Sequence, residues 1–170
     1  MAHAVRAVLA REAVRPANTA GRRARGAHMN EHAIEVDEFL PHPPARVWRA
    51  LTDPDLLARW LMPNDFEPSV GHRFTFATRP VPNAGFDGTV HCEVLEIDAE
   101  RLLRIGWAGG GLDTTVTWRL APEGTGTRLF VEHRGFDLDD PAQQFAFKGM
   151  GSGWRTNVLR ALRDTLAEVA

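Results

Sequence analysis

His133 is the residue of this chain best suited to chemistry. In residues 127–134, Leu129, Val131 and His133 lie two residues apart, so a strand would turn all three side chains toward one face. A histidine in an apolar interior could orient a ligand or act as an acid–base group. It could equally be a hydrogen-bonded core residue that organises the turn into Gly135. The pattern favours the structural role, so no catalytic residue is assigned and His133 is kept as a candidate.

Other chemically capable residues give weaker patterns. His91 and Glu93 share one face of a predicted strand and could both reach a ligand or metal, but a metal site needs a third ligand, and His72 does not securely supply one. An exposed sheet face is favoured, and we predict no metal. Cys92, the only cysteine, lies on the apolar phase of its strand, which predicts an inert buried thiol. Ser152 is an N-cap candidate for a final helix and has no matching catalytic triad.

The glycine-rich segments do not form a phosphate-binding loop. Residues 109–111 connect two predicted strands rather than a strand and a helix. Residues 151–153 open a helix but follow no strand, and they lack the lysine of a phosphate loop. The sequence therefore predicts no nucleotide site and no cofactor.

The elements that must position these residues follow a clear order. A half-buried strand at 33–40 precedes two short helices, and a long helix at 151–169 follows a short helix within 141–148. On the strand at 86–97, Val94 faces one side and Leu95 and Ile97 the other. The class is α+β, with a curved antiparallel sheet of about six strands wrapped around the long C-terminal helix. The remaining predicted strands are 71–77, 101–107, 114–120 and 127–134.

The two short helices are the best defined local feature. Pro43 and Pro44 end the first strand and begin a helix, because the fixed φ of proline suits the first helical turn. Asp53 and Pro54 then end that helix and begin the next, with Asp53 as N-cap. The tryptophans of this segment face the interior as core or ligand-facing residues.

Length and charge limit the classes of function. The chain has 170 residues, with 20 basic and 22 acidic, and predicts one domain at 29–170. Residues 1–28 hold six arginines and one glutamate, so residues 29–170 carry 14 basic and 21 acidic residues. An acidic body disfavours nucleic acid as a partner. No apolar run is long enough for a signal peptide or a membrane span, and a cytoplasmic location is expected.

The basic segment 1–28 has several interpretations. Low hydrophobicity with high charge favours a disordered extension, or one that is not part of the native protein if Met29 is the true start. A transit-like segment and a segment that attracts nucleic acid are the alternatives.

The chain is rich enough in aromatic residues to line a pocket. Five tryptophans and nine phenylalanines exceed what a bare scaffold needs, and ligand sites are usually apolar with a few polar groups. Each candidate could equally be solid core. The predicted ligand-binding residues are Trp48, Trp60, Phe74, Phe76, Val90, Trp107, Val116, Trp118, Val131, His133, Trp154 and Val158.

Three segments carry a family resemblance. They are 43–60 (PPARVWRALTDPDLLARW), 94–97 (VLEI) with Arg101, Leu102 and Trp107, and 133–136 (HRGF) followed by Gly153 and Trp154. Over 31–170 the chain resembles the SRPBCC superfamily, the helix-grip fold of START domains and the birch-pollen allergen. Within it, the chain is similar to the branch named for activators of the heat-shock-protein-ninety ATPase.

The resemblance implies a cavity between the curved sheet and the long helix. Members of the superfamily bind lipids, polyketides and other apolar molecules, a few are cyclases or aromatases, and others work through protein contacts. The leading hypothesis is therefore a protein that binds an apolar or aromatic small molecule. A co-chaperone-like module with a protein partner is the second hypothesis. A cyclase or hydrolase that uses His133 is the third, so an enzyme is the less favoured class.

Overall fold

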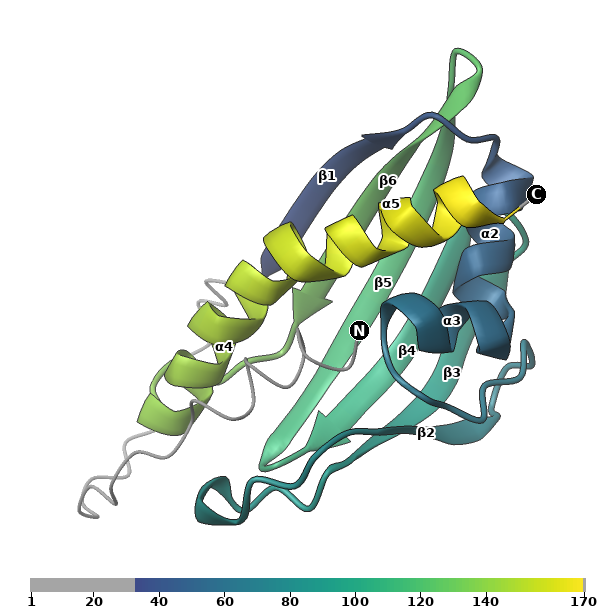
Figure 1. Ribbon diagram of the computed structural model, residues 1–170. Coiled ribbons are helices and arrows are strands. Elements are labelled where there is room, and N and C mark those ends of the chain that lie inside the picture. Colours follow the sequence, from purple (N-terminus) through teal and green to yellow (C-terminus); the bar gives the residue numbers. More distant parts are fainter. Residues whose placement is uncertain (1–32, 170) are drawn as a thin grey trace.

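A curved antiparallel sheet of six strands is the framework of the chain. The computed structural model describes residues 33–169, and the predicted extension at 1–28 lies outside them. The strands follow the spatial order β1-β6-β5-β4-β3-β2, so the first and last strands pair and β3 to β6 form a meander (Figure 1). This confirms the predicted α+β class. The strands are β1 (Ile34–Leu40), β2 (Arg73–Ala77), β3 (Thr89–Asp98), β4 (Leu102–Gly109), β5 (Leu112–Glu123) and β6 (Gly126–Arg134).

Alternation along the strands directs apolar side chains to the inner face. Paired residues share a face, so the register of Trp118 with Leu103 and with Val131 places all three side chains inside. A β-bulge interrupts β3 between Val94 and Glu96. The extra residue, Leu95, is exposed, and Ile97 returns to the inner face opposite Leu103. The prediction that Ile97 shares the outer face with Leu95 was therefore wrong, because a bulge shifts the phase by one residue.

The two short helices form as predicted. They are α2 (Pro44–Thr52) and α3 (Pro54–Trp60), each with a proline in its first turn. Asp53 lies between them in an extended conformation, and its carboxylate accepts from the backbone N–H groups of Asp55 (2.9 Å) and Leu56 (3.4 Å). This N-cap satisfies two donors that would otherwise be orphaned, so it fixes the angle at which α3 leaves α2.

The C-terminal helix is longer than predicted. It runs without a break through α4 (Pro141–Gly153), a π-helical turn η2 (Trp154–Val158) and α5 (Leu159–Glu168). Its N-cap is Asp140, which accepts from the N–H of Ala142 at 2.9 Å. The prediction of two separate helices with Ser152 as a cap was wrong. The glycines of 149–153 lie inside the helix, where the packing of α4 against β1 outweighs their low helix propensity.

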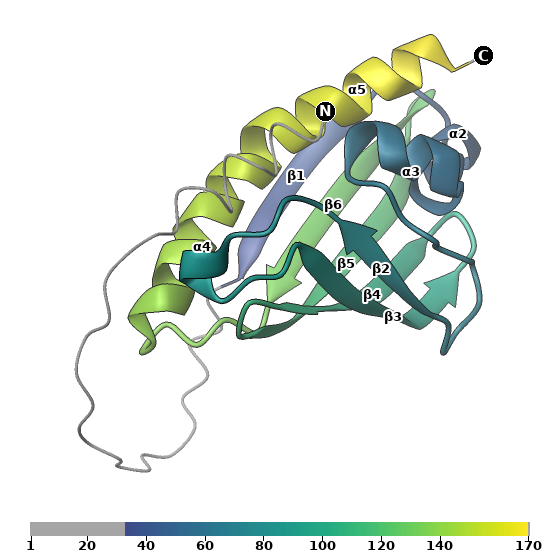
Figure 2. The ribbon, with the colours of Figure 1, turned by 60° about the horizontal axis from the view of Figure 1, so that its bottom comes forward.

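The helices all cover the inner face of the sheet. The long helix crosses this face diagonally, and α2 and α3 sit between its C-terminal half and the strands (Figure 2). A short 3-10 turn, η1 (Pro82–Ala84), lies in the connection between β2 and β3. One continuous apolar cluster fills the space between the layers.

Candidate functional site

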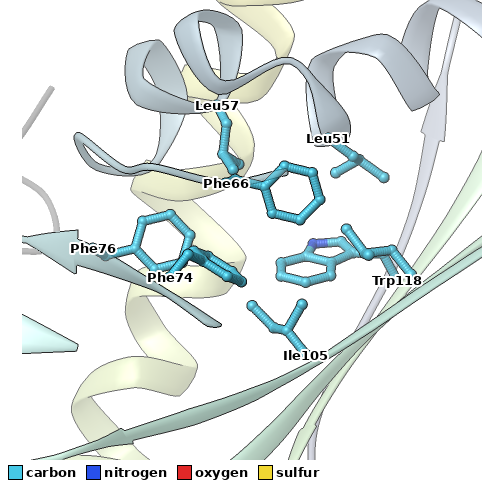
Figure 3. Close-up of a pocket in the computed structure, with 8 residues that line it drawn as sticks. Leu51, Leu57, Phe66, Phe74, Phe76, Ile105 and Trp118 are labelled. Carbon is cyan, nitrogen blue, oxygen red and sulfur yellow. The ribbon is translucent and has the colours of Figure 1, made fainter. Parts of the chain in front are cut away.

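A small apolar cavity lies between the α2–α3 pair and the sheet (Figure 3). The cavity volume is about 10 Å³, which is room for about one water molecule. Helices, a loop and strands all contribute, and the only polar side-chain atom of the lining is the indole nitrogen of Trp118. The lining residues are Leu51 of α2, Leu57 of α3, Phe66 of the following loop, Phe74 and Phe76 of β2, Leu103 and Ile105 of β4, and Trp118 of β5.

The place of this cavity differs from the predicted one. The sequence predicts a cavity between the sheet and the long helix, but no residue of α4, η2 or α5 lines this one. The N-terminal part of the long helix packs directly on the sheet, where the ring of Trp154 contacts those of Trp107 and Trp118, and its C-terminal part α5 packs on α2 and α3. The cavity instead lies at the end of the sheet that α2 and α3 cover.

Three of the twelve predicted ligand-binding residues line the cavity: Phe74, Phe76 and Trp118. Trp60 is buried, and its indole N–H donates to the backbone oxygen of Ala50 at 2.8 Å. Trp48 is only half-buried at the edge of the core. The other predicted residues are all buried in the core cluster or beside it: Val90, Trp107, Val116, Val131, His133, Trp154 and Val158. Their part in ligand binding stays a prediction.

Five lining residues were not predicted. Leu51 and Leu57 lie on the apolar faces of the two short helices, and Leu103 and Ile105 alternate along a strand. Their burial could therefore be predicted from the sequence, but their position at a cavity could not. Phe66 had no such signal because it lies in an irregular segment.

The side chain of Asn64 holds the loop that delivers Phe66. Its Nδ2 group donates to the backbone oxygens of Pro54 (3.1 Å) and Met62 (3.0 Å), and its Oδ1 accepts from the N–H of Phe66 (3.0 Å). An isolated bridge also pairs Asn64 with Phe76 of β2. These bonds tie the loop both to the start of α3 and to the edge strand, so Phe66 is fixed against the cavity.

A continuous series of aromatic contacts leads from the cavity to the centre of the core. Phe66, Phe74, Phe76 and Trp107 follow one another with ring centroids 5.2, 5.4 and 5.5 Å apart. Such spacings are those of favourable edge-to-face and tilted pairs. The series passes from the loop across β2 to β4, and it brings the cavity wall next to the rings that surround His133.

His133 is fully buried, and neighbouring side chains occupy both of its ring nitrogens. The indole N–H of Trp154 donates to Nδ1 at 3.1 Å, and Nε2 lies 2.8 Å from Oγ1 of Thr114. The Thr114 hydroxyl donates its hydrogen to the backbone oxygen of Trp107 at 2.8 Å, so its oxygen accepts from the imidazole. The ring is therefore the neutral tautomer with its proton on Nε2.

Burial sets the protonation state of this imidazole. It lowers the pKa of His133 from 6.5 to about 3, because an imidazolium would lose its hydration in the core. A proton on Nδ1 would also displace the bond from Trp154. The arrangement links β4, β5, β6 and the long helix through one ring, which favours the structural role expected from the sequence. The acid–base role stays a prediction.

The other candidate residues show no assembled reactive site. Cys92 is buried, and burial, with a smaller effect from Asp65, raises the pKa of its thiol to about 12. His91 is exposed on the outer face, and His72 Nε2 lies 3.0 Å from the backbone oxygen of Asp65. Within residues 33–169 no three potential metal ligands come together. None of the helices in this range is long and apolar enough to cross a membrane.

Comparison with known proteins identifies the family. The family model described as "Activator of Hsp90 ATPase homolog 1-like protein" matches residues 41–167. Protein MLL2253 from Mesorhizobium loti is 34% identical, with a TM-score of 0.72 over 82% of this chain and 99% of that chain. Protein BH1534 from Bacillus halodurans is 23% identical, with a TM-score of 0.65 over 79% of this chain and 96% of that chain.

DynU16, a putative protein in the dynemicin biosynthetic locus, is 22% identical, with a TM-score of 0.64 over 80% of this chain and 47% of that chain. At identities this low, the similarity to DynU16 and BH1534 shows only that the fold is shared. The comparison with curated proteins gives no match. Because the family model spans most of the chain, the protein belongs to the Activator of Hsp90 ATPase homolog 1-like family, a branch of the SRPBCC helix-grip proteins.

Proposed function

We propose that this protein binds a small apolar or aromatic molecule in the cavity beneath α2 and α3. The observation that carries the proposal is the lining: four aliphatic and four aromatic side chains converge there from two helices, a loop and three strands. An apolar lining with very few polar groups is the usual composition of a small-molecule site. The ligand chemistry of the superfamily, as the sequence resemblance implies it, agrees with this composition.

A ligand larger than water needs the α2–α3 pair to move outward. At the surface, an ion pair between Arg59 of α3 and Glu168 of α5 holds this pair. Both side chains are largely exposed, and exposed ion pairs contribute about 0–1 kcal/mol. This ion pair therefore adds little to the hold of α5 on α3, and the cost of the movement lies in the buried apolar packing of the two short helices.

Filling the cavity is expected to abolish binding of a hydrocarbon probe. Indane should bind the native protein saturably at one equivalent and raise its melting temperature, since a ligand of the folded state stabilises it. In Leu103→Phe the larger ring should occupy the space opposite Trp118 and weaken binding at least tenfold. Isothermal titration calorimetry measures both affinities.

The matched control is Leu95→Phe, which makes the same substitution at an exposed position of the outer face. It should bind indane as the native protein does. Overpacking at Leu103 costs about 1–3 kcal/mol, so circular dichroism must first show that the variant is folded. Native protein that takes up no indane, or a Leu103→Phe variant that binds it equally well, would contradict the proposal.

A protein-contact function is the second candidate, and one surface feature favours it. Phe39 of β1 and Phe130 of β6 are 41% and 40% exposed on the outer face, and the guanidinium of Arg128 lies 5.8 Å from the centre of the Phe39 ring. Aromatic residues and arginine are enriched at interfaces. A partner on this face should lose affinity in Phe39→Ala/Phe130→Ala.

The corresponding measurement is the ATPase rate of a heat-shock-protein-ninety chaperone with and without this protein. Stimulation that the double substitution removes would favour the contact function, and an unchanged rate at micromolar protein would count against it. An enzymatic role for His133 has less support, because both ring nitrogens already have partners inside the protein.

A further inference from the structure

We infer that the ligand of this cavity carries a hydrogen-bond acceptor that pairs with the indole N–H of Trp118. The inference rests on the proposed function and names the chemical class of its ligand. Trp118 is only 2% exposed, and its Nε1 atom is buried without a hydrogen-bond partner among the described residues. In Figure 3 the indole lies among the lining side chains, with its nitrogen on the edge nearer Phe66 and Leu51.

Two of the other three buried tryptophans in residues 33–169 pair their indole N–H group with an acceptor inside the protein. The indole N–H of Trp60 has the backbone oxygen of Ala50, and that of Trp154 has Nδ1 of His133. Buried tryptophan N–H groups normally find such an acceptor, and an unpaired buried donor is unfavourable. Trp118 therefore presents an unpaired indole N–H donor in the lining of an apolar cavity.

The rest of the lining cannot use this donor. The other seven lining side chains are leucine, isoleucine and phenylalanine, which carry no acceptor. A water molecule there would gain one bond from Trp118 and little from the hydrocarbon wall, whereas buried waters usually make about three bonds. A ligand oxygen can pair with the N–H while the hydrocarbon part of the same molecule fills the apolar space.

These conditions define a ligand class. The molecule is apolar or aromatic and has one accessible acceptor, such as the carbonyl oxygen of a ketone, quinone or lactone. A carboxylate or ammonium group fits poorly, because no charged side chain lines the cavity to compensate for its loss of hydration. The chain thus selects carbonyl compounds over hydrocarbons of the same shape.

The test compares two probes of one skeleton, indane and 1-indanone, which differ by a carbonyl oxygen. Calorimetric affinities are measured for the native protein, for Trp118→Phe and for the control Leu95→Phe, on the exposed outer face of the sheet. Trp118→Phe keeps an aromatic ring and removes the donor. We expect it to weaken 1-indanone about threefold to tenfold, the effect of one hydrogen bond. The affinity for indane should change less than twofold, and Leu95→Phe should alter the affinity for neither probe.

A second measurement follows ligand binding in the native protein and uses a variant only for assignment. The indole proton of Trp118 can be assigned among the tryptophan resonances of a nitrogen-15 NMR spectrum by its absence in Trp118→Phe. 1-Indanone should move this proton downfield, as a new hydrogen bond does, and indane should not. Equal shifts with both probes, or an equal loss of affinity for both in Trp118→Phe, would overturn the inference while the cavity remained a binding site. If neither probe binds the native protein, the proposed function fails and this inference falls with it.

Discussion

Replacing His133 with alanine is expected to lower the free energy of unfolding by about 3–5 kcal/mol. The substitution empties part of a fully buried site, and it leaves the indole N–H of Trp154 without its acceptor. It also removes the donor that faces the Thr114 hydroxyl. Cavities left by large-to-small changes in a core and unpaired buried donors are two of the mechanisms behind large destabilisations by a single residue. Urea unfolding followed by tryptophan fluorescence measures the loss.

The matched control is His91→Ala, on the exposed outer face of β3. It should change the free energy of unfolding by less than about 0.5 kcal/mol. His133→Gln should be intermediate, because an amide can accept from Trp154 and donate to Thr114. A His133→Ala variant as stable as the control would show that the ring does not hold the strands and the long helix together.

The same histidine should make the stability fall in mild acid. Its pKa is about 3 in the folded protein and 6.5 as the ordinary value that applies on unfolding. Between these values the unfolded chain binds one more proton than the folded chain, so the free energy of unfolding decreases as the pH falls. The contribution of His133 is complete above pH 6.5 and is lost progressively toward pH 3. From pH 7 to pH 4.5 the loss is about 2–3 kcal/mol.

A comparison of native protein with His133→Gln isolates this contribution. Carboxylates titrate equally in both proteins, whereas the amide does not titrate. The two curves of unfolding free energy against pH should therefore converge in acid, with the native protein losing about 2–3 kcal/mol more by pH 4.5. Parallel curves would mean that the buried imidazole is protonated in the folded state, contrary to its hydrogen bonds.

The elements of this fold were predictable where a local rule acts alone. The Asp53–Pro54 junction carries its own cap and stop signals, and it forms as predicted. Alternation also placed Leu129, Val131 and His133 on the inner face. The errors lie where packing overrides the local rule. The glycines of 149–153 stay helical because α4 packs against β1, and the bulge at Leu95 returns Ile97 to the core.

The site was less predictable than the fold. Burial of Phe74, Phe76 and Trp118 follows from strand periodicity, but the cavity depends on where α2 and α3 rest on the sheet. Phe66 belongs to no periodic pattern and is fixed by the side chain of Asn64. The free indole N–H of Trp118 was also invisible, because the sequence does not state which of several buried tryptophans lacks an acceptor.

The central claim is that an apolar ligand enters the cavity beneath α2 and α3. A crystal structure of the protein with 5-bromo-1-indanone tests it most directly, because the anomalous signal of bromine locates the ligand without bias. The account predicts one bromine peak inside the space bounded by Leu51, Phe74 and Trp118, with the carbonyl oxygen within hydrogen-bonding distance of the indole nitrogen. A ligand found only on the surface, or only between the sheet and the long helix, would contradict the account.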